Sequence, residues 1–203
     1  FEYHRRETVQ INNIGSENPP TVISNFNHSN PKVEDLSKLG FNYMNQLDKW
    51  SISDQATDIL YCQDDRFNFV LPGRLSVILK DNPDPFCFLT TEGILQSDSS
   101  KFENKIVIYS LTDSDNYQKI RSVFFHLVKN NITNPVVLKK DYKINSYEEI
   151  QLLASHELGG LFLDGFGDGL WLTQNDQNLN NLAFNILQAT RTRISKTEYI
   201  SCP

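Results

Sequence analysis

Apolar residues in the second half of the chain alternate between short continuous runs and segments with helical spacing. Helices are predicted over 117–130, 146–155 and 179–191, where apolar side chains recur every three or four residues. Ser146 precedes the middle helix and Glu149 follows three residues later, a pair typical of a capping box. The apolar runs before, between and after these helices predict four strands: 106–109, 135–138, 161–163 and 199–200.

The first half of the chain is less regular and richer in turn residues. A strand is predicted over 21–23. A helix is predicted to begin at Pro31, with Asn30 as its cap and apolar side chains at helical spacing up to Tyr43. Turns that contain proline separate three further strand candidates: 59–61, 75–79 and 86–89.

The succession of strands and helices predicts an α/β fold. Strands that are apolar along nearly their whole length are typical of a mostly parallel sheet covered by helices. Roughly seven to nine strand candidates stand against fewer helices. We therefore expect an irregular or incomplete (β/α) barrel of the TIM type.

Composition and charge exclude several classes of protein. Of the 203 residues, 39% are hydrophobic and 22% are charged, which is typical of globular proteins. The net charge of −6, without a basic run, argues against binding to nucleic acid. No apolar run is long enough to span a membrane, and no signal peptide opens the sequence. The first residue is Phe1 and not Met, so we expect an internal piece of a longer protein.

The cysteines favour a reducing compartment. Cys62, Cys87 and Cys202 are an odd number at scattered spacing, unlike a disulfide framework. Cys62 and Cys87 lie in strand-like runs and are expected to be ordinary core residues.

The residues alone indicate no catalytic site. Three alternate glycines in 164–169 could cradle a phosphate if a helix began behind them, but they lead into an apolar strand or packed loop. A ligand loop and a tight structural turn both remain open. A Gly-x-Ser-x-Gly nucleophile turn is absent. Arg191, Arg193 and Lys196 are expected to be the solvated end of a helix.

The C-terminal stretch carries the most specific pattern. It reads Ala183-Phe184-Asn185-Ile186-Leu187-Gln188-Ala189, then Arg191-Thr192-Arg193, then Lys196-Thr197-Glu198-Tyr199-Ile200-Ser201-Cys202-Pro203. This closely resembles 4-hydroxy-3-methylbut-2-enyl diphosphate synthase, a family in which Cys-Pro opens a Cys-Pro-x-Cys element that binds a four-iron–four-sulfur cluster. The resemblance implies that Cys202 is a metal ligand in the full-length enzyme. A single cysteine cannot hold a cluster, because each iron needs its own ligand, so we expect none in the chain itself.

Two upstream segments resemble the large insert in the three-domain form of this enzyme, which occurs in plants and some bacteria. Residues 1–6 resemble the aromatic-Arg-Arg segment that opens the insert, and 159–169 resemble a segment near its end. The resemblance implies that 1–195 form a TIM-barrel-like central insert domain. Residues 196–203 would then begin the iron–sulfur domain.

Residues 165–173 resemble a degenerate copy of a segment in the family's substrate barrel, Gly-Ile-Gly-Asp-Thr-Ile-Arg-Val-Ser-Leu, whose Arg and Ser contact the diphosphate. Trp171 stands where that Arg would be, and Thr173 stands at the Ser. A neutral indole cannot replace a guanidinium that binds phosphate oxygens. The insert is then either a duplicated barrel that lost its site or a case of convergence.

The resemblance implies that the full-length enzyme is an iron–sulfur oxidoreductase of isoprenoid biosynthesis. In the methylerythritol phosphate pathway it would reductively convert methylerythritol cyclic diphosphate to hydroxymethylbutenyl diphosphate. Its partners would be a ferredoxin or flavodoxin and, for this chain, the substrate barrel and cluster domain of the same enzyme. The location would be the bacterial cytoplasm or the plastid stroma.

For the chain itself we expect a structural insert that is inactive, with no catalytic residues, no nucleic-acid partner and no membrane partner. Two alternatives remain. The first is a domain that binds a phosphorylated ligand or regulator at the carboxyl ends of its strands. The second is a docking module for a reductant protein or for a homodimer.

Overall fold

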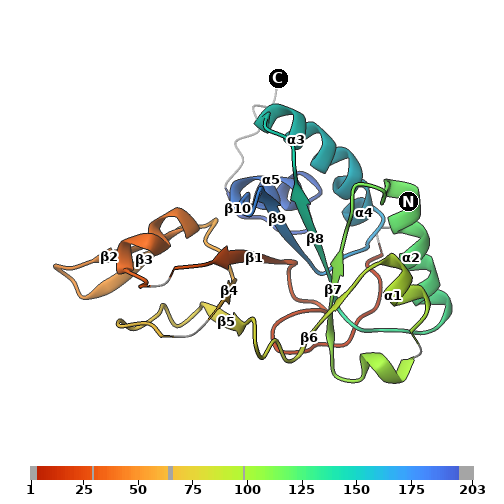
Figure 1. Cartoon of the computed structure of the whole chain (residues 1–203), viewed down its shortest axis with the longest axis horizontal. Coiled ribbons are helices and arrows are strands. Elements are labelled where there is room, and N and C mark those ends of the chain that lie inside the picture. The colour runs from red at the N-terminus through yellow and green to blue at the C-terminus, as the bar shows by residue number, and fades with distance from the viewer. Residues whose placement is uncertain (1–3, 29, 64–65, 98, 197–203) are drawn as a thin grey trace.

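The computed structural model describes residues 4–28, 30–63, 66–97 and 99–196. Its main feature is a curled sheet of seven parallel strands (Figure 1). The order along the sheet is β5-β4-β1-β9-β8-β7-β6, and a short strand β10 (Gln177–Asn178) pairs antiparallel with β9. The seven strands are β1 (Thr21–Phe26), β4 (Ile59–Cys62), β5 (Ser76–Leu79), β6 (Phe86–Leu89), β7 (Ile106–Ser110), β8 (Val136–Tyr142) and β9 (Gly169–Gln174).

The strand order is that of a barrel opened at one place. The first strand, β1, pairs with the last parallel strand, β9, with Thr21 opposite Gly169. A (β/α) barrel closes in this way. In the part of the chain that the structure describes, no ladder joins β5 to β6, so the ring of strands is broken there. The predicted fold class, an irregular or incomplete (β/α) barrel with a mostly parallel sheet, is confirmed.

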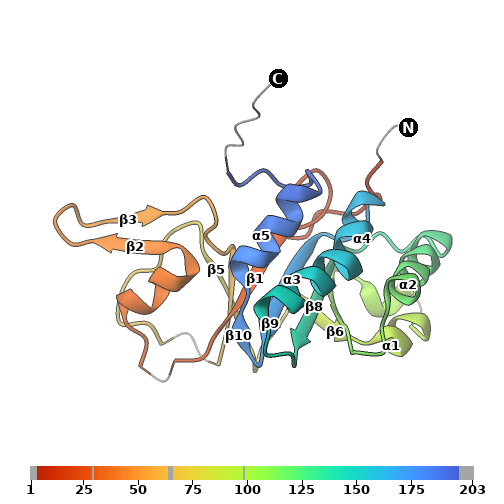
Figure 2. The same cartoon turned by 90° about the horizontal axis from the view of Figure 1, so that it is seen from above.

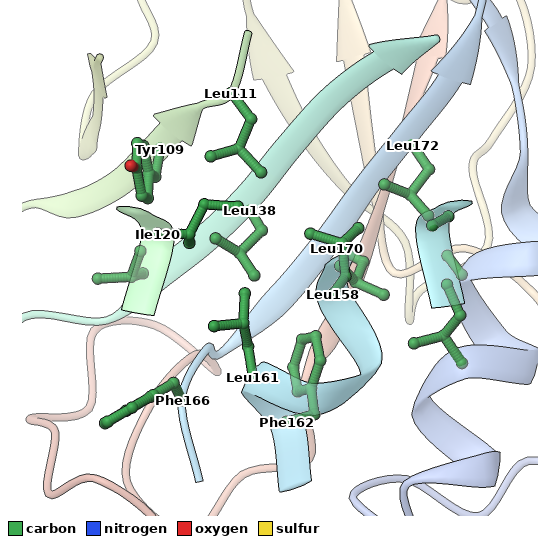
Figure 3. Packing of buried hydrophobic residues seen from close by; sticks show 14 of the residues in the cluster. Tyr109, Leu111, Ile120, Leu138, Leu158, Leu161, Phe162, Phe166, Leu170 and Leu172 are labelled. Carbon is green, nitrogen blue, oxygen red and sulfur yellow. The ribbon is translucent and has the colours of Figure 1, made fainter. Parts of the chain in front are cut away.

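Helices cover the outer face of the sheet. Since side chains alternate along a strand, Leu138 of β8 and Leu170 of β9 point to the same face. They pack there against Leu158, Leu161 and Phe162 (Figure 3). The helices of this layer are α1 (Thr91–Leu95), α2 (Tyr117–Lys129), α3 (Tyr147–Ala154), α4 (Gly160–Leu163) and α5 (Asn180–Ala189). Their apolar sides and the outer face of the strands form the largest core cluster.

The inner face holds a second, smaller core. Its buried members are Ile14, Ile23, Ile59, Ile78, Phe86, Ile106, Ile108, Val137 and Trp171. Across the break in the ring, Tyr61 of β4 contacts Phe88 of β6, with ring centroids 5.9 Å apart. Side chains therefore close the barrel where the hydrogen-bonded ladder is interrupted.

A hairpin extends away from the helical layer on the side of β4 and β5 (Figures 1 and 2). It consists of β2 (Phe41–Met44) and β3 (Lys49–Ile52) and follows a 3₁₀ helix, η1 (Val33–Leu39). The helix predicted from Pro31 to Tyr43 was therefore wrong in type and extent, and its cap position is Lys32. The observed helix η1 ends at Gly40, whose backbone is left-handed with a φ of 93°. Gly40 also lies so near Ala56 that a Cβ at position 40 would meet the Cα of Ala56 at 2.5 Å.

The strand predicted over 161–163 is also wrong, because these residues form α4. From Ser155 to Gly159 the chain makes a π-helical turn, η3, between α3 and α4, so the helical path continues. Leu161 and Phe162 are buried, whereas Leu163 is 58% exposed. Three consecutive apolar residues do not distinguish a buried strand from a buried helix.

Most other predicted elements are confirmed to within a few residues. Helices 117–130 and 179–191 are α2 and α5, and Val128, one of the apolar residues of the first, is 49% exposed. Ser146 caps α3 by accepting a hydrogen bond from the backbone N of Glu149 (3.3 Å), and its hydroxyl contacts the Glu148 carboxylate (3.2 Å). The strand predicted over 199–200 lies outside the described residues.

Candidate functional site

The carboxyl ends of the strands are where (β/α) barrels place their sites. We call the inner-face residues toward this end the mouth: Asn25, Tyr61, Phe88, Lys139 and Trp171. Trp171 is fully buried, and its Nε1 donates a hydrogen bond to Oδ1 of Asn25 (3.1 Å). Its ring lies 4.8 Å from that of Tyr61 and 6.1 Å from that of Phe88. The indole thus fills the inside of the barrel between the rings of Tyr61 and Phe88.

Lys139 lies against these three aromatic rings. Its Nζ is 4.0 Å from the ring centroid of Trp171, 5.4 Å from that of Phe88 and 5.8 Å from that of Tyr61. Burial lowers the pKa of Lys139, although the carboxylates of Asp176 and Asp141 act in the opposite direction. The Lys139 amine makes no hydrogen bond or ion pair with any of the described residues.

Asp141 follows Lys139 on the same face of β8. One of its oxygens accepts from the hydroxyl of Thr173 (2.7 Å) and from the backbone N of Asp176 (3.0 Å), and the other pairs with Lys143. Burial raises the pKa of Asp141, but the hydrogen bonds from Lys143, Asp176 and Thr173 outweigh it, so the pKa is lowered. Asp141 is therefore a satisfied carboxylate at the edge of the mouth.

The glycine-containing segment 164–169 lies at the opposite end of the barrel, where β9 begins. Gly165 is left-handed, with a φ of 80°, and a Cβ there would meet the backbone O of His4 at 2.2 Å. Asp168, only 2% exposed, accepts from Arg5 Nη2 (2.7 Å) and from the backbone N of Val136 (2.8 Å). The segment is a tight structural turn packed against the N-terminal residues. Of the two interpretations left open by the sequence, a ligand loop and a tight structural turn, the structure favours the turn.

The three basic residues near the C-terminus, Arg191, Arg193 and Lys196, have different surroundings. Arg193 donates from Nη2 to Asp58 (2.9 Å) and from Nη1 to the backbone O of Pro20 (2.9 Å), and its side chain is only 10% exposed. Arg191 and Lys196 are exposed. The expectation of a solvated helix end is thus wrong for Arg193, because sequence spacing gave no sign of its distant partner Asp58.

Comparison with known proteins relates the chain to one enzyme family. No family profile matches it. It is 31% identical to a protein of Parabacteroides distasonis named 4-hydroxy-3-methylbut-2-en-1-yl diphosphate synthase (flavodoxin), over 98% of the chain and 34% of that protein. A Bacteroides thetaiotaomicron protein of the same name is 29% identical over 98% of the chain and 35% of its own length. The chain is a homologue of part of these synthases.

A chloroplastic 4-hydroxy-3-methylbut-2-en-1-yl diphosphate synthase (ferredoxin) of Arabidopsis thaliana matches a shorter part, at 39% identity over 41% of the chain and 12% of that protein. The chain spans about a third of the length of the bacterial synthases that it matches along nearly its whole length. The family resemblance carried by the sequence motifs is therefore confirmed.

The described residues do not fit the iron–sulfur cluster that the synthase family implies. Cys62 is buried in β4, Cys87 lies partly buried in β6, and Cys202 lies outside the described residues. Within ranges 4–28, 30–63, 66–97 and 99–196, no three His, Cys, Asp or Glu side chains gather as a metal site. In the same ranges no helix is both long and apolar enough to cross a bilayer.

Lys139 is one of the mouth residues that sequence reasoning missed. The strand was predicted to end at Leu138. In the structure β8 continues to Tyr142, with Lys139 and Asp141 facing inward and Lys140 facing outward. The signal was the continued alternation: extending the strand by its period of two would have placed Lys139 on the same face as Val137.

Proposed function

We propose that residues 1–195 form a structural insert domain of a 4-hydroxy-3-methylbut-2-en-1-yl diphosphate synthase, and that 196–203 lead into its iron–sulfur domain. The observation that carries this proposal is the anchoring of both ends of the domain beside the start of one strand, β1. Val22 donates its backbone N to the Asp58 carboxylate (2.8 Å), and Thr21 donates its backbone N to the backbone O of Asp168 (2.9 Å).

These two aspartates hold the two ends of the domain. Asp168 binds Arg5, near the point where the chain enters, and Asp58 binds Arg193, near the point where it leaves. Asp58 precedes β4 and Asp168 precedes β9, the two neighbours of β1 in the sheet. An insert that joins two other domains at one place needs its ends fixed close together, and this arrangement supplies that.

We further propose that the whole protein is an iron–sulfur oxidoreductase of isoprenoid biosynthesis that forms hydroxymethylbutenyl diphosphate from methylerythritol cyclic diphosphate. The cluster would take up electrons from a flavodoxin or ferredoxin, the reductants that the names of the relatives contain. Because one relative is chloroplastic and others are bacterial, we propose the plastid stroma or bacterial cytoplasm as its location.

Two features of the mouth support a role that does not involve the cyclic diphosphate. The indole of Trp171 is fully buried, and by the resemblance of 165–173 to the family's substrate-barrel segment it would stand where that segment carries a phosphate-binding arginine. The carboxylates of Asp141 and Asp176 act on Lys139 and would repel a diphosphate. The alternative of a phosphorylated ligand is therefore less well supported.

The docking alternative has one observation in its favour. Exposed large apolar side chains on the helical layer include Phe125 (48%), Val128 (49%), Leu152 (74%) and Leu163 (58%). They come from α2, α3 and α4, which cover one face of the sheet. A contact between this layer and another domain of the same synthase would be compatible with the insert role.

In the whole synthase, Cys202→Ser is expected to abolish turnover and to lower the iron content, because the resemblance makes Cys202 a cluster ligand. Cys62→Ser is the matched control. It is expected to keep the iron and lose only about 1–3 kcal/mol of stability, because a hydroxyl replaces a buried thiol in an apolar core. Iron per chain and urea denaturation measure the two effects. Equal iron loss in both variants, at equal folded fraction, would contradict the assignment.

A further inference from the structure

A cavity of about 600 Å³ opens at the end of the barrel opposite the mouth. The first residues of four parallel strands line it: Thr21, Ile59, Ser76 and Phe86. Strands β5 and β6 contribute two of its walls, and in the described part of the chain no ladder joins these two strands. The cavity therefore lies at the amino end of the break in the ring of strands.

The inside of this cavity is apolar. Ile14, Ile59, Ile78 and Phe86 belong to the inner core and also line the cavity. Ile194, another lining residue, is 81% exposed. Since β5 pairs only with β4 and β6 only with β7 among the described strands, each leaves one edge of its backbone without a partner strand. Such edges are surfaces on which an extended segment of another domain can pair.

The rim of the cavity carries charges of both signs. Arg193 already binds both oxygens of Asp58, so the guanidinium of Arg74, 3.3 Å from the same carboxylate, adds a positive charge that Asp58 does not balance. Arg74 is 48% exposed and has no other partner among the described residues. Asp54 lines the same cavity and pairs with none of them, whereas Asp84 pairs with Lys105. One open charge of each sign matches a protein segment better than a diphosphate.

Both ends of the domain are fixed at this cavity. Arg5 donates to the backbone O of Asn18 (2.6 Å), and Asn18 lines the cavity. Arg193 and Ser195 line it directly. The chain spans 34% of its Parabacteroides distasonis relative. For an insert domain, the rest of the synthase then adjoins the domain beside this cavity.

From this geometry we propose that an extended segment of an adjoining domain of the same synthase occupies the cavity. Its backbone pairs with the open edges of β5 and β6, and an apolar side chain covers Ile59, Ile78 and Phe86. An acidic side chain pairs with Arg74 and a basic one with Asp54. The inference rests on the proposed insert role and names the surface through which the insert is held.

The test is maleimide labelling of Ser76→Cys, because Ser76 is exposed on the wall of the cavity. Ser51→Cys, an exposed position in β3 of the hairpin, is the matched control. Each variant is labelled in the 203-residue chain and in the whole synthase, and peptide mass spectrometry separates the new thiol from Cys62, Cys87 and Cys202. If the cavity is covered in nine molecules of ten, labelling at position 76 should be about tenfold slower in the synthase, while position 51 changes less than about twofold.

A second pair of variants tests the charge contact. In the synthase that carries Ser76→Cys, Arg74→Gln should bring labelling at position 76 back toward the rate in the chain alone. Lys80→Gln removes an exposed positive charge beyond the other end of β5 and should leave that rate unchanged. Circular dichroism checks that each variant is folded.

Equal labelling rates at position 76 in the chain and in the synthase would overturn the inference and leave the insert role standing. Methylerythritol cyclic diphosphate is also added to the chain alone. Slower labelling at position 76 in its presence would make the cavity a ligand site, and it would overturn both the inference and the insert role.

Discussion

Asp168→Ala is expected to lower the free energy of unfolding of the chain by about 3–5 kcal/mol, the usual cost of removing one partner from a buried ion pair. Asp168 is 2% exposed and lies 2.7 Å from Arg5 and 3.5 Å from Arg6, whose side chain is only 4% exposed. Its carboxylate also accepts from the backbone N of Val136. The substitution removes the counter-ion of the buried Arg6 guanidinium, which keeps only its hydrogen bonds to the backbone oxygens of Ile132 and Asn134, and it removes the carboxylate that accepts from the Val136 N–H. Urea denaturation measures the loss.

Asp164→Ala is the matched control, four residues away. Asp164 also pairs with an arginine, Arg121, at 2.6 Å, but the two side chains are 29% and 41% exposed. A solvated pair of this kind contributes at most about 1 kcal/mol. Equal losses in the two variants would show that Asp168 does not anchor the N-terminal residues.

Trp171→Ala is expected to cost about 3–5 kcal/mol, because it empties the centre of the inner core. The indole is fully buried, contacts Tyr61 and Phe88 and donates a hydrogen bond to Asn25. Without it, the aromatic contacts that close the ring between β4 and β6 lose their common neighbour. The loss is measured by urea denaturation of the chain.

Trp50→Ala is the comparison for this variant. Trp50 lies in β3 of the hairpin, is partly exposed and packs on Tyr43 and Phe69. Its removal should cost clearly less, since the hairpin lies outside the barrel core. A loss as large as that of Trp171→Ala would contradict the view that the indole of Trp171 holds the barrel together.

The parts of the fold that the sequence predicted are those set by local pattern. Strands β6, β7 and β8 and helix α2 follow from apolar runs and helical spacing alone. The hairpin of β2 and β3 was missed because it depends on the left-handed Gly40, which interrupts an apparently helical apolar pattern. Residues 161–163 were misassigned because burial on one side of a continuing helix produces the same apolar run as a strand.

The candidate site depends on contacts between residues far apart in the sequence, which no local pattern contains. Arg193 meets Asp58 across 135 residues, and Arg5 meets Asp168 across 163. The family resemblance singled out Trp171, but its contacts with Tyr61, Phe88 and Asn25 join strands that are far apart in the sequence. Lys139 joins rings from β4, β6 and β9 only when the sheet curls, so its surroundings were visible only in the structure.

We propose that this domain serves the synthase as a structural insert and does not bind its substrate. Calorimetric titration of the folded 203-residue chain with methylerythritol cyclic diphosphate tests it most directly, with the whole synthase as the positive control. A structural insert should give no saturable heat under conditions in which the whole enzyme binds. Saturable binding to the chain, weakened by Lys139→Met at unchanged stability, would contradict the account and make the mouth a phosphorylated-ligand site.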